Sequence, residues 1–423
     1  MIVGDGIKNT FTVIIVSMLL IASAVIAIGV FLILSNDSPT FSTPIGPKRT
    51  DNGEILEQDL NENFQGYTIM VLWGSYYEMG YAHAELLGDY IVRGVNEIKS
   101  LMGPYYNDIR SIISGSEWIP SEIEDEFDGM VDSLAISHPS ANVDEIDLKV
   151  INTAGDWLYD YACRSHSCWG RYVEDPIKTL STRRLDYETF IPTLNHHLLV
   201  AYNPDDGSTQ WLNFGFPGII VSMTGVNEYG TLASIHDYEV IGGTDISAGR
   251  ISRMAAIRYA LTYPTNSDLS THLTSVYGEL QNYDHMITSF LNYYVPEGYG
   301  GVMTSNPWGY EGDISDLRLP HSDWHHAEAI ITTNYQTSGS YTPSDEDFGA
   351  DYYYNDETPK TLESHWDLLA VEDSFLNLHL LSVAYRDRGD MTIWADGRLD
   401  NVGRTPRFEY EWSELFDSDI YLN

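Results

Sequence analysis

The first third of the chain shows mostly helical spacing of its hydrophobic residues. Between residues 143 and 161 they recur with the helical period, at Ile146, Val150, Ile151, Ala154 and Leu158, which predicts a helix. A β-rich run over 67–73 precedes a capping-box pattern at 75–78, which predicts a helix reaching residue 101. A second capping box at 121–124 predicts another helix. Cys163 therefore falls just past a helix end, at the start of a predicted strand.

From Cys163 onward the pattern changes to short segments typical of strands. The segments 197–202 and 210–214 flank a strong hairpin turn over 203–207. Further strands are predicted at 221–224, 231–235, 327–333, 378–385 and 391–394, and helices at 251–261, 269–280 and 362–370. Alternating groups of helices and strands predict an α+β fold built of packed layers.

Residues 11–34 carry no charged side chain. At about 1.5 Å of rise per residue, a helix of this length spans a hydrocarbon core of about 30 Å. The run is longer than the apolar region of a cleavable signal peptide, so we expect an uncleaved transmembrane anchor. Residues 1–10 would form a cytoplasmic tail and the polar, proline-containing 35–64 a tether. We expect the globular part to face the outside of the cell membrane, because so short a tail is easily left in the cytoplasm.

The charge balance narrows the range of partners. The 423 residues include 22 basic and 62 acidic ones, for a net charge of −40. Such a surface repels phosphate, which disfavours nucleic-acid binding and docking on anionic lipid. Hydrophobic residues make up 43% of the chain, enough for a sizeable core. Cys163 and Cys168 are its only cysteines, so no disulfide framework is predicted.

The most chemically suggestive stretch is 163–187, which reads CRSHSCWGRYVEDPIKTLSTRRLDY. Two short strands joined by a loop would bring Arg183 and Asp186 alongside Cys163. A guanidinium stabilises a thiolate, and a carboxylate can orient its base, so the three residues are candidates for nucleophilic catalysis. The alternative is an ordinary hairpin with a salt bridge, in which the cysteine is buried as a small apolar residue.

Several short runs occur along the chain in this order: 163–170, 182–187, 216–218, 225–230 and the pair Thr333-Asn334. This ordered set resembles the family of the acyltransferase that acylates 6-aminopenicillanic acid, among the N-terminal-nucleophile (Ntn) hydrolases. Penicillin V acylase, bile-salt hydrolase and acid ceramidase are more distant relatives. The helix expected at 75–87 is similar to the one in that family's leading segment, so the resemblance extends over residue 65 to the C-terminus.

The resemblance implies a four-layer αββα sandwich and an inactive precursor that cuts itself before Cys163. Residues 65–162 would be the leading segment, or α chain, and 163–423 the catalytic core, or β chain. The new α-amine of Cys163 would act as base, since such an amine has a pKa of about 8. The substrate would be an N-acyl amide or acyl thioester, and no cofactor or metal is implied.

The resemblance also assigns roles residue by residue. Cys163 would be the nucleophile, Arg183 would support its thiolate, and Asp186 would hold the α-amine. Asn227 matches an asparagine near the substrate, and Asn334 one whose side chain helps form the oxyanion hole. Arg184 and Thr182 depart from the family pattern, as does His166, which stands where relatives carry an aromatic residue.

Two other functions remain open at this stage. A non-catalytic cell-surface binding domain would fit the predicted anchor and the 30 tyrosines. A metallohydrolase would need ligands from His196, His197, His321, His325 or His326, yet none of these has the spacing of a known zinc motif. Adjacent histidines on a strand point to opposite faces, so each pair would give one ligand at most. Asp205 and Asp206 suit a solvated turn better than a Ca²⁺ site.

Overall fold

A computed structural model of the chain describes residues 49–60, 65–157, 161–187, 192–237, 247, 249–264, 268–287, 289–305, 314–319, 328–333, 358–370, 377–399, 403–404 and 407–417. The predicted anchor at 11–34 lies outside these ranges. None of the described helices is both long and apolar enough to cross a membrane.

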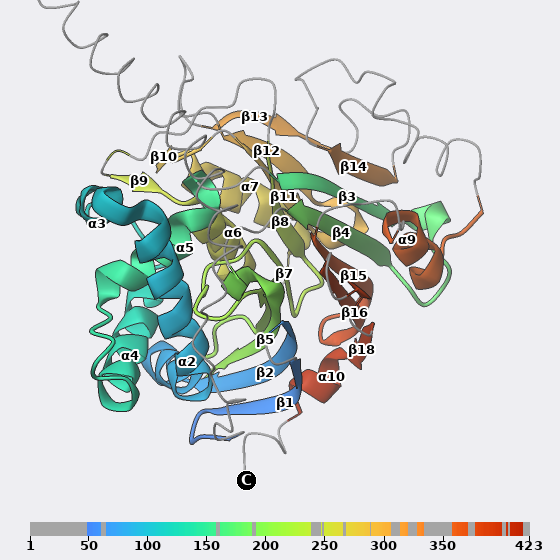
Figure 1. The fold of residues 1–423 in the computed structure, drawn as a ribbon. Coiled ribbons are helices and arrows are strands. Elements are labelled where there is room, and N and C mark those ends of the chain that lie inside the picture. Colours follow the sequence, from blue (N-terminus) through green and yellow to red (C-terminus); the bar gives the residue numbers. More distant parts are fainter. Residues whose placement is uncertain are drawn as a thin grey trace, which may run out of the picture.

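Two sheets form the centre of the molecule (Figure 1). The first is nine-stranded and contains β1 (Gly53–Leu60), β2 (Gly66–Gly74), β5 (His196–Pro204), β6 (Trp211–Gly215), β7 (Thr224–Asn227), β8 (Leu232–Asp237), β11 (Ser289–Tyr294), β12 (Gly301–Ser305) and β13 (Ile314–Arg318), in this spatial order. The second is seven-stranded and contains β14 (Ala329–Thr333), β3 (Tyr161–Trp169), β4 (Thr179–Tyr187), β15 (Asn377–Asp387), β16 (Asp390–Leu399) and β17 (Gly403–Arg404), with β18 (Phe408–Glu411) also on β16. Within these sheets only the β2–β5 pair is described as parallel.

The helices are α2 (Tyr76–Met102), α3 (Tyr106–Ile113), α4 (Glu122–Ser137), α5 (Glu145–Trp157), α6 (Arg253–Thr262), α7 (Leu269–Leu280), α9 (Leu362–Leu369) and α10 (Trp412–Leu415). The short parallel strands β9 (Arg250–Ile251) and β10 (Asp284–His285) pair beside them. Most helices lie on the outer face of the first sheet, and α9 lies on the outer face of the second (Figure 1).

Four hydrophobic clusters show how these layers pack. The largest joins α2, α4, α5 and α6 to the outer face of the first sheet, through residues such as Met70 and Val200. A second cluster lies between the sheets and brings Ile69 and Leu199 together with Val383 and Ile393. Smaller clusters join α9 to the second sheet. The order is therefore helix, sheet, sheet, helix, a mixed α and β fold with the layers predicted from the sequence.

Most predicted elements are present close to their expected places. The capping box at Ser75 opens α2, the segment 269–280 is α7, and the helix predicted before Cys163 is α5. The box predicted at Ser121 is wrong, because its side chain makes no capping bond to α4. The predicted tether also ends too late, because β1 takes residues 53–60 into the first sheet. Its partner β2 lies in 65–162, the range predicted as the leading segment, and both strands are part of the first sheet.

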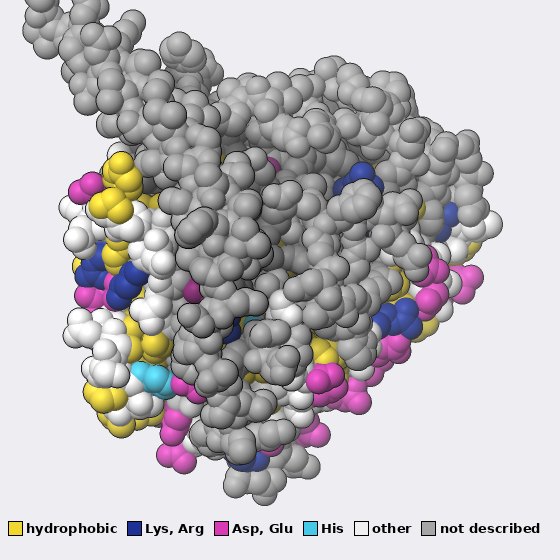
Figure 2. Space-filling view, in the orientation of Figure 1, with side chains coloured by type: hydrophobic (Ala, Val, Ile, Leu, Met, Phe, Trp, Pro, Cys, Tyr) yellow, Lys and Arg dark blue, Asp and Glu magenta, His cyan; other side chains and the backbone are white. Residues whose placement is uncertain are grey.

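The described surface carries many acidic side chains. Figure 2 shows them along the border where Figure 1 places α9, β18 and α10. Basic residues there sit between carboxylates: Arg386 contacts Asp390 and Glu411, and Arg407 contacts Glu363 and Glu409. Exposed pairs of this kind contribute little to stability, about 0–1 kcal/mol each.

Candidate active site

Cys163 lies near the start of β3, in the hairpin that β3 forms with β4. The two strands are antiparallel, with Cys163 opposite Leu185 and Ser165 opposite Arg183. The predicted alignment of the two halves of 163–187 is therefore confirmed. Side chains alternate between the faces of a strand, and Cys163, Leu185 and Arg183 face the first sheet, between the layers.

The Arg183 guanidinium contacts the sulfur directly. Its Nη2 donates to Cys163 Sγ at 3.3 Å and to the backbone oxygen of Ile235, on β8, at 2.9 Å. Arg183 is fully buried and Cys163 is 3% exposed. Because charge-assisted contacts strengthen away from water, this cation is well placed to favour a thiolate.

Burial has the opposite effect on the sulfur. It raises the pKa of the Cys163 thiol to about 12, and the nearby Arg183 cation opposes that shift. The carboxylates of Asp237 and Asp186 add to the rise, whereas Arg253 counteracts it. The thiol is therefore protonated near neutral pH, so attack requires a group that can take its proton.

Asp186 lies on the other face of β4. Its carboxylate accepts from Arg184 Nε at 3.0 and 2.8 Å and from Nη2 at 2.7 Å. Arg184 Nη1 also donates to the Leu369 carbonyl at the end of α9, at 2.8 Å. This explains the departure at Arg184: the guanidinium joins Asp186 to the helix on the outer face. Asp186 nevertheless stands opposite Ala162 in the ladder, beside the backbone that precedes Cys163.

Asn227 stabilises a turn at the end of β7. Its Oδ1 accepts from the backbone N–H groups of Tyr229 and Thr231, each at 3.1 Å, and its Nδ2 donates to the Leu261 carbonyl at 3.0 Å. These bonds are typical of an asparagine that stabilises a turn. Asn334 lies outside the described residues, directly after β14.

A group of residues that the sequence did not single out lies beside Cys163. Arg253, at the start of α6, donates to Asp237 at the end of β8 and to the Gly155 carbonyl at 2.8 Å. Its Nε lies 3.2 Å from Asp156 Oδ1. A basic residue in the first turn of a helix is unfavourable to the helix dipole. The position of Arg253 in the sequence therefore indicates that its cation pairs with acceptors on another element.

Aromatic rings lie next to Arg183 between the sheets. His379 stands opposite Leu185 on β15, in one row with Cys163. Its ring stacks on Phe214 and Phe216, with centroids 3.8 and 4.9 Å away, and lies 4.5 Å from the ring of His197. Burial lowers the pKa of both histidines, which keeps them neutral. The sequence does not reveal this cluster, because β15 with His379 lies far along the chain from β5 and β6.

His196 and His197, on β5, point to opposite sides of the first sheet. His196 contacts Thr68 at 2.7 Å on the helix side of β5, whereas its neighbour His197 faces the second sheet. Over the described ranges, no three His, Cys, Asp or Glu side chains gather as metal ligands do. His321, His325 and His326 lie outside those ranges.

Cys168 has a separate environment on the outer face of β3. It is fully buried, and its Sγ lies 3.2 Å from His365 Nε2, on α9. The ring of His166 stacks on that of His365, with centroids 4.0 Å apart. The departure at His166 is thus accommodated by a second imidazole, and Cys168 packs in the α9 layer.

Comparison with known proteins adds little to this geometry. No protein-family model matches the sequence, and no curated protein matches it. Among the solved structures that match, a Caenorhabditis elegans ortholog of N-acylethanolamine-hydrolyzing acid amidase is similar over 52% of this chain and 92% of its own. The identity is 12% and the TM-score 0.35, a likeness too low to support a conclusion about fold or activity.

Proposed function

We propose that this chain is a cysteine amidohydrolase of the Ntn type, which cuts its own Ala162–Cys163 bond and then hydrolyses an N-acyl amide. The observation that carries the proposal is the contact between Arg183 and the Cys163 sulfur, at the start of a strand that follows a helical leading segment. A thiolate gains more than a neutral thiol from a buried guanidinium that donates a hydrogen bond to the sulfur.

Self-cleavage would begin with attack of Cys163 Sγ on the Ala162 carbonyl carbon. The peptide C–N bond breaks, a thioester forms, and the thiol proton passes to the freed nitrogen. Water then attacks the thioester, which releases the Ala162 carboxyl group and regenerates the thiol. The net reaction consumes one water and leaves Cys163 as the first residue of the β chain.

During self-cleavage the departing nitrogen takes the thiol proton, and after the cut the freed α-amine can serve as the base for attack on a substrate. With a pKa of about 8, it can accept the thiol proton near neutral pH. Arg183 then stabilises the thiolate, which attacks the substrate carbonyl and forms an acyl-enzyme. Water resolves this intermediate in a hydrolase, whereas an amine resolves it in an acyltransferase. Roles for Asp186 at the α-amine and for Asn227 and Asn334 at the oxyanion are part of the same proposal.

The reaction can be tested with purified wild type and Cys163→Ala. Each is incubated with N-acyl amines of graded chain length, and amine release and protein mass are followed. The proposal expects wild type to release the amine and to carry one acyl group on the peptide that begins with Cys163. It expects neither result for Cys163→Ala. Equal amine release by the two proteins would refute a thiol mechanism.

We also propose that residues 11–34 anchor the protein in the cell membrane, with the catalytic part outside. The basis is the uncharged length of this segment. Protease added to intact cells should degrade the catalytic part, and deletion of 1–34 should release the protein from the membrane fraction. A full-length protein that stays in the soluble fraction would contradict the anchor.

A further inference from the structure

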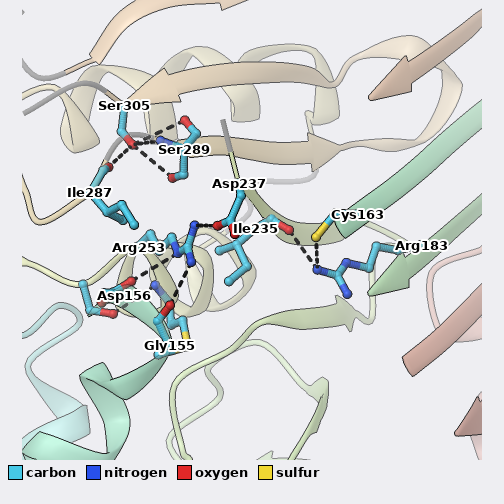
Figure 3. A network of polar contacts seen from close by, with 12 residues as sticks. Gly155, Asp156, Cys163, Arg183, Ile235, Asp237, Arg253, Ile287, Ser289 and Ser305 are labelled. Atoms are coloured by element: carbon cyan, nitrogen blue, oxygen red, sulfur yellow. Dashed lines mark hydrogen bonds and ion pairs between the residues drawn. The ribbon is translucent and has the colours of Figure 1, made fainter. Parts of the chain in front are cut away.

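Arg253 is a buried cation that connects three separate parts of the chain. It begins α6 directly after the N-cap Ser252 and is fully buried, as is Asp156. Its guanidinium reaches the end of α5 through the Gly155 carbonyl and the Asp156 carboxylate, and it reaches β8 through Asp237. Figure 3 shows these contacts converging on one side chain.

The helix end that Arg253 holds leads directly to the proposed cleavage point. Gly155 and Asp156 lie in the last turn of α5, which ends at Trp157. The chain enters β3 at Tyr161 and reaches Cys163 immediately afterwards. The last carbonyls of a helix lack partners within it, and a cation there also complements the helix dipole. Arg253 provides both the donor and the charge.

The carboxyl end of β8 is the common anchor for both sides of the Ala162–Cys163 bond. The Ile235 carbonyl accepts from Arg183, which also donates to the Cys163 sulfur. Two residues later Asp237 accepts from Arg253, which holds the end of α5. Figure 3 shows the resulting path from the sulfur through β8 to Asp156. A guanidinium suits this task because its planar fork can bind several acceptors in fixed directions.

We infer that Arg253 is a positioning residue for self-cleavage, which holds the segment before Cys163 so that the sulfur can reach the Ala162 carbonyl. This inference rests on the proposed function and adds to it the residue that fixes the leaving segment. Intramolecular attack depends steeply on such positioning, since a displacement of about 1 Å can cost about 100-fold in rate.

The test follows self-cleavage of the newly made full chain in a cell-free synthesis, with labelled methionine, as conversion to two fragments over time. Arg253→Met removes the fork and the charge, and we expect conversion per folded molecule to slow about 100-fold. Arg253→Lys keeps the charge without the fork and should recover part of the rate. Asp156→Asn keeps the shape of the side chain but removes its charge and should also slow conversion.

Arg258→Met is the matched control. Arg258 is equally buried and pairs with Glu126 on α4, and its other described hydrogen bond goes to the Ile220 carbonyl. Resistance to added protease gives the folded fraction of each variant. Arg258→Met should convert at close to the wild-type rate per folded molecule. If Arg253→Met does not fold, Asp156→Asn decides.

The possible outcomes separate this inference from the proposed function. Conversion of folded Arg253→Met, or of folded Asp156→Asn, at the wild-type rate would overturn the role of Arg253 and leave self-cleavage standing. Equal slowing in Arg258→Met would also overturn it, because loss of any buried ion pair would then suffice. A wild type that never converts would refute self-processing itself.

Discussion

Arg183 on β4 donates a hydrogen bond to the Cys163 sulfur across the β3–β4 hairpin, at 3.3 Å. The same nitrogen bonds to the Ile235 carbonyl of the other sheet at 2.9 Å. The cation is thereby held by contacts to both sheets, which restrict the position of the Arg183 side chain relative to the sulfur.

Replacing Arg183 should shift the pH dependence of self-cleavage. Burial raises the pKa of the Cys163 thiol to about 12, and Arg183 lowers it. In Arg183→Met the pKa should rise further, so the thiolate fraction at a given pH falls and the rate profile moves to higher pH. The rate of fragment formation is measured from pH 6 to 10 (about four decades of thiolate fraction). Arg171→Met, at an exposed position, is the control, and an unmoved profile in Arg183→Met would argue against the assigned role.

The contribution of Asp156 to the free energy of unfolding should depend on pH. Burial raises its pKa from 3.8 to about 6, against the effect of Arg253. Between these values the folded protein binds more protons than the unfolded chain, so this contribution to the free energy of unfolding falls as pH rises. It is fully present below pH 3.8 and lost above about pH 6. The stability difference between wild type and Asp156→Asn should therefore decrease across that interval; an increase would contradict it.

The buried pair of Glu126 and Arg258 should be important for stability. Both side chains are fully buried, and their ion pair joins α4 to α6. Arg258 also donates to the Ile220 carbonyl at 2.9 Å. Glu126→Gln leaves an uncompensated buried cation, so we expect a loss of about 3 kcal/mol. Asp390→Asn, which breaks a surface pair with Arg386, should cost under about 1 kcal/mol. Urea denaturation measures both, and similar losses in the two variants would be evidence against this difference.

A substitution at Asn227 can distinguish a role in the turn from a role in binding the oxyanion. Its amide makes three hydrogen bonds within and near the turn. Asn227→Asp keeps the acceptor but loses the donor to the Leu261 carbonyl, and the loss should cost about 1–3 kcal/mol of stability. If the amide serves the turn alone, kcat per folded molecule should stay near the wild-type value. A fall in kcat of about 100-fold would instead indicate an oxyanion contact.

The sequence predicted the hairpin and the layers well because they depend on local signals. The change from helical to strand spacing near Cys163 placed α5, β3 and β4, and the turn at 203–207 placed the hairpin of β5 and β6. It missed β1 because 53–60 mixes charged and apolar residues without alternation. That strand is formed through its pairing with β2 rather than through its own pattern.

The candidate site was predictable only in part. The pairing of two strands tells which residues are neighbours, but the face of the strand on which each side chain lies must also match. Arg183 and Asp186 were both expected beside the sulfur, yet an odd spacing places them on opposite faces of β4. Asp186 is held there by Arg184, which departs from the family pattern. Arg253 and Asp237 come from elements far from Cys163 in the sequence, so their convergence required the tertiary structure.

The most direct test is the mass of the folded protein, measured under denaturing conditions for wild type and Cys163→Ala. The account predicts two wild-type fragments, one of which begins with Cys163 by N-terminal sequencing, and a single intact chain for Cys163→Ala. A wild type that remains one chain while it hydrolyses an N-acyl amide would contradict self-processing. Fragments of the same size in Cys163→Ala would show that another group makes the cut.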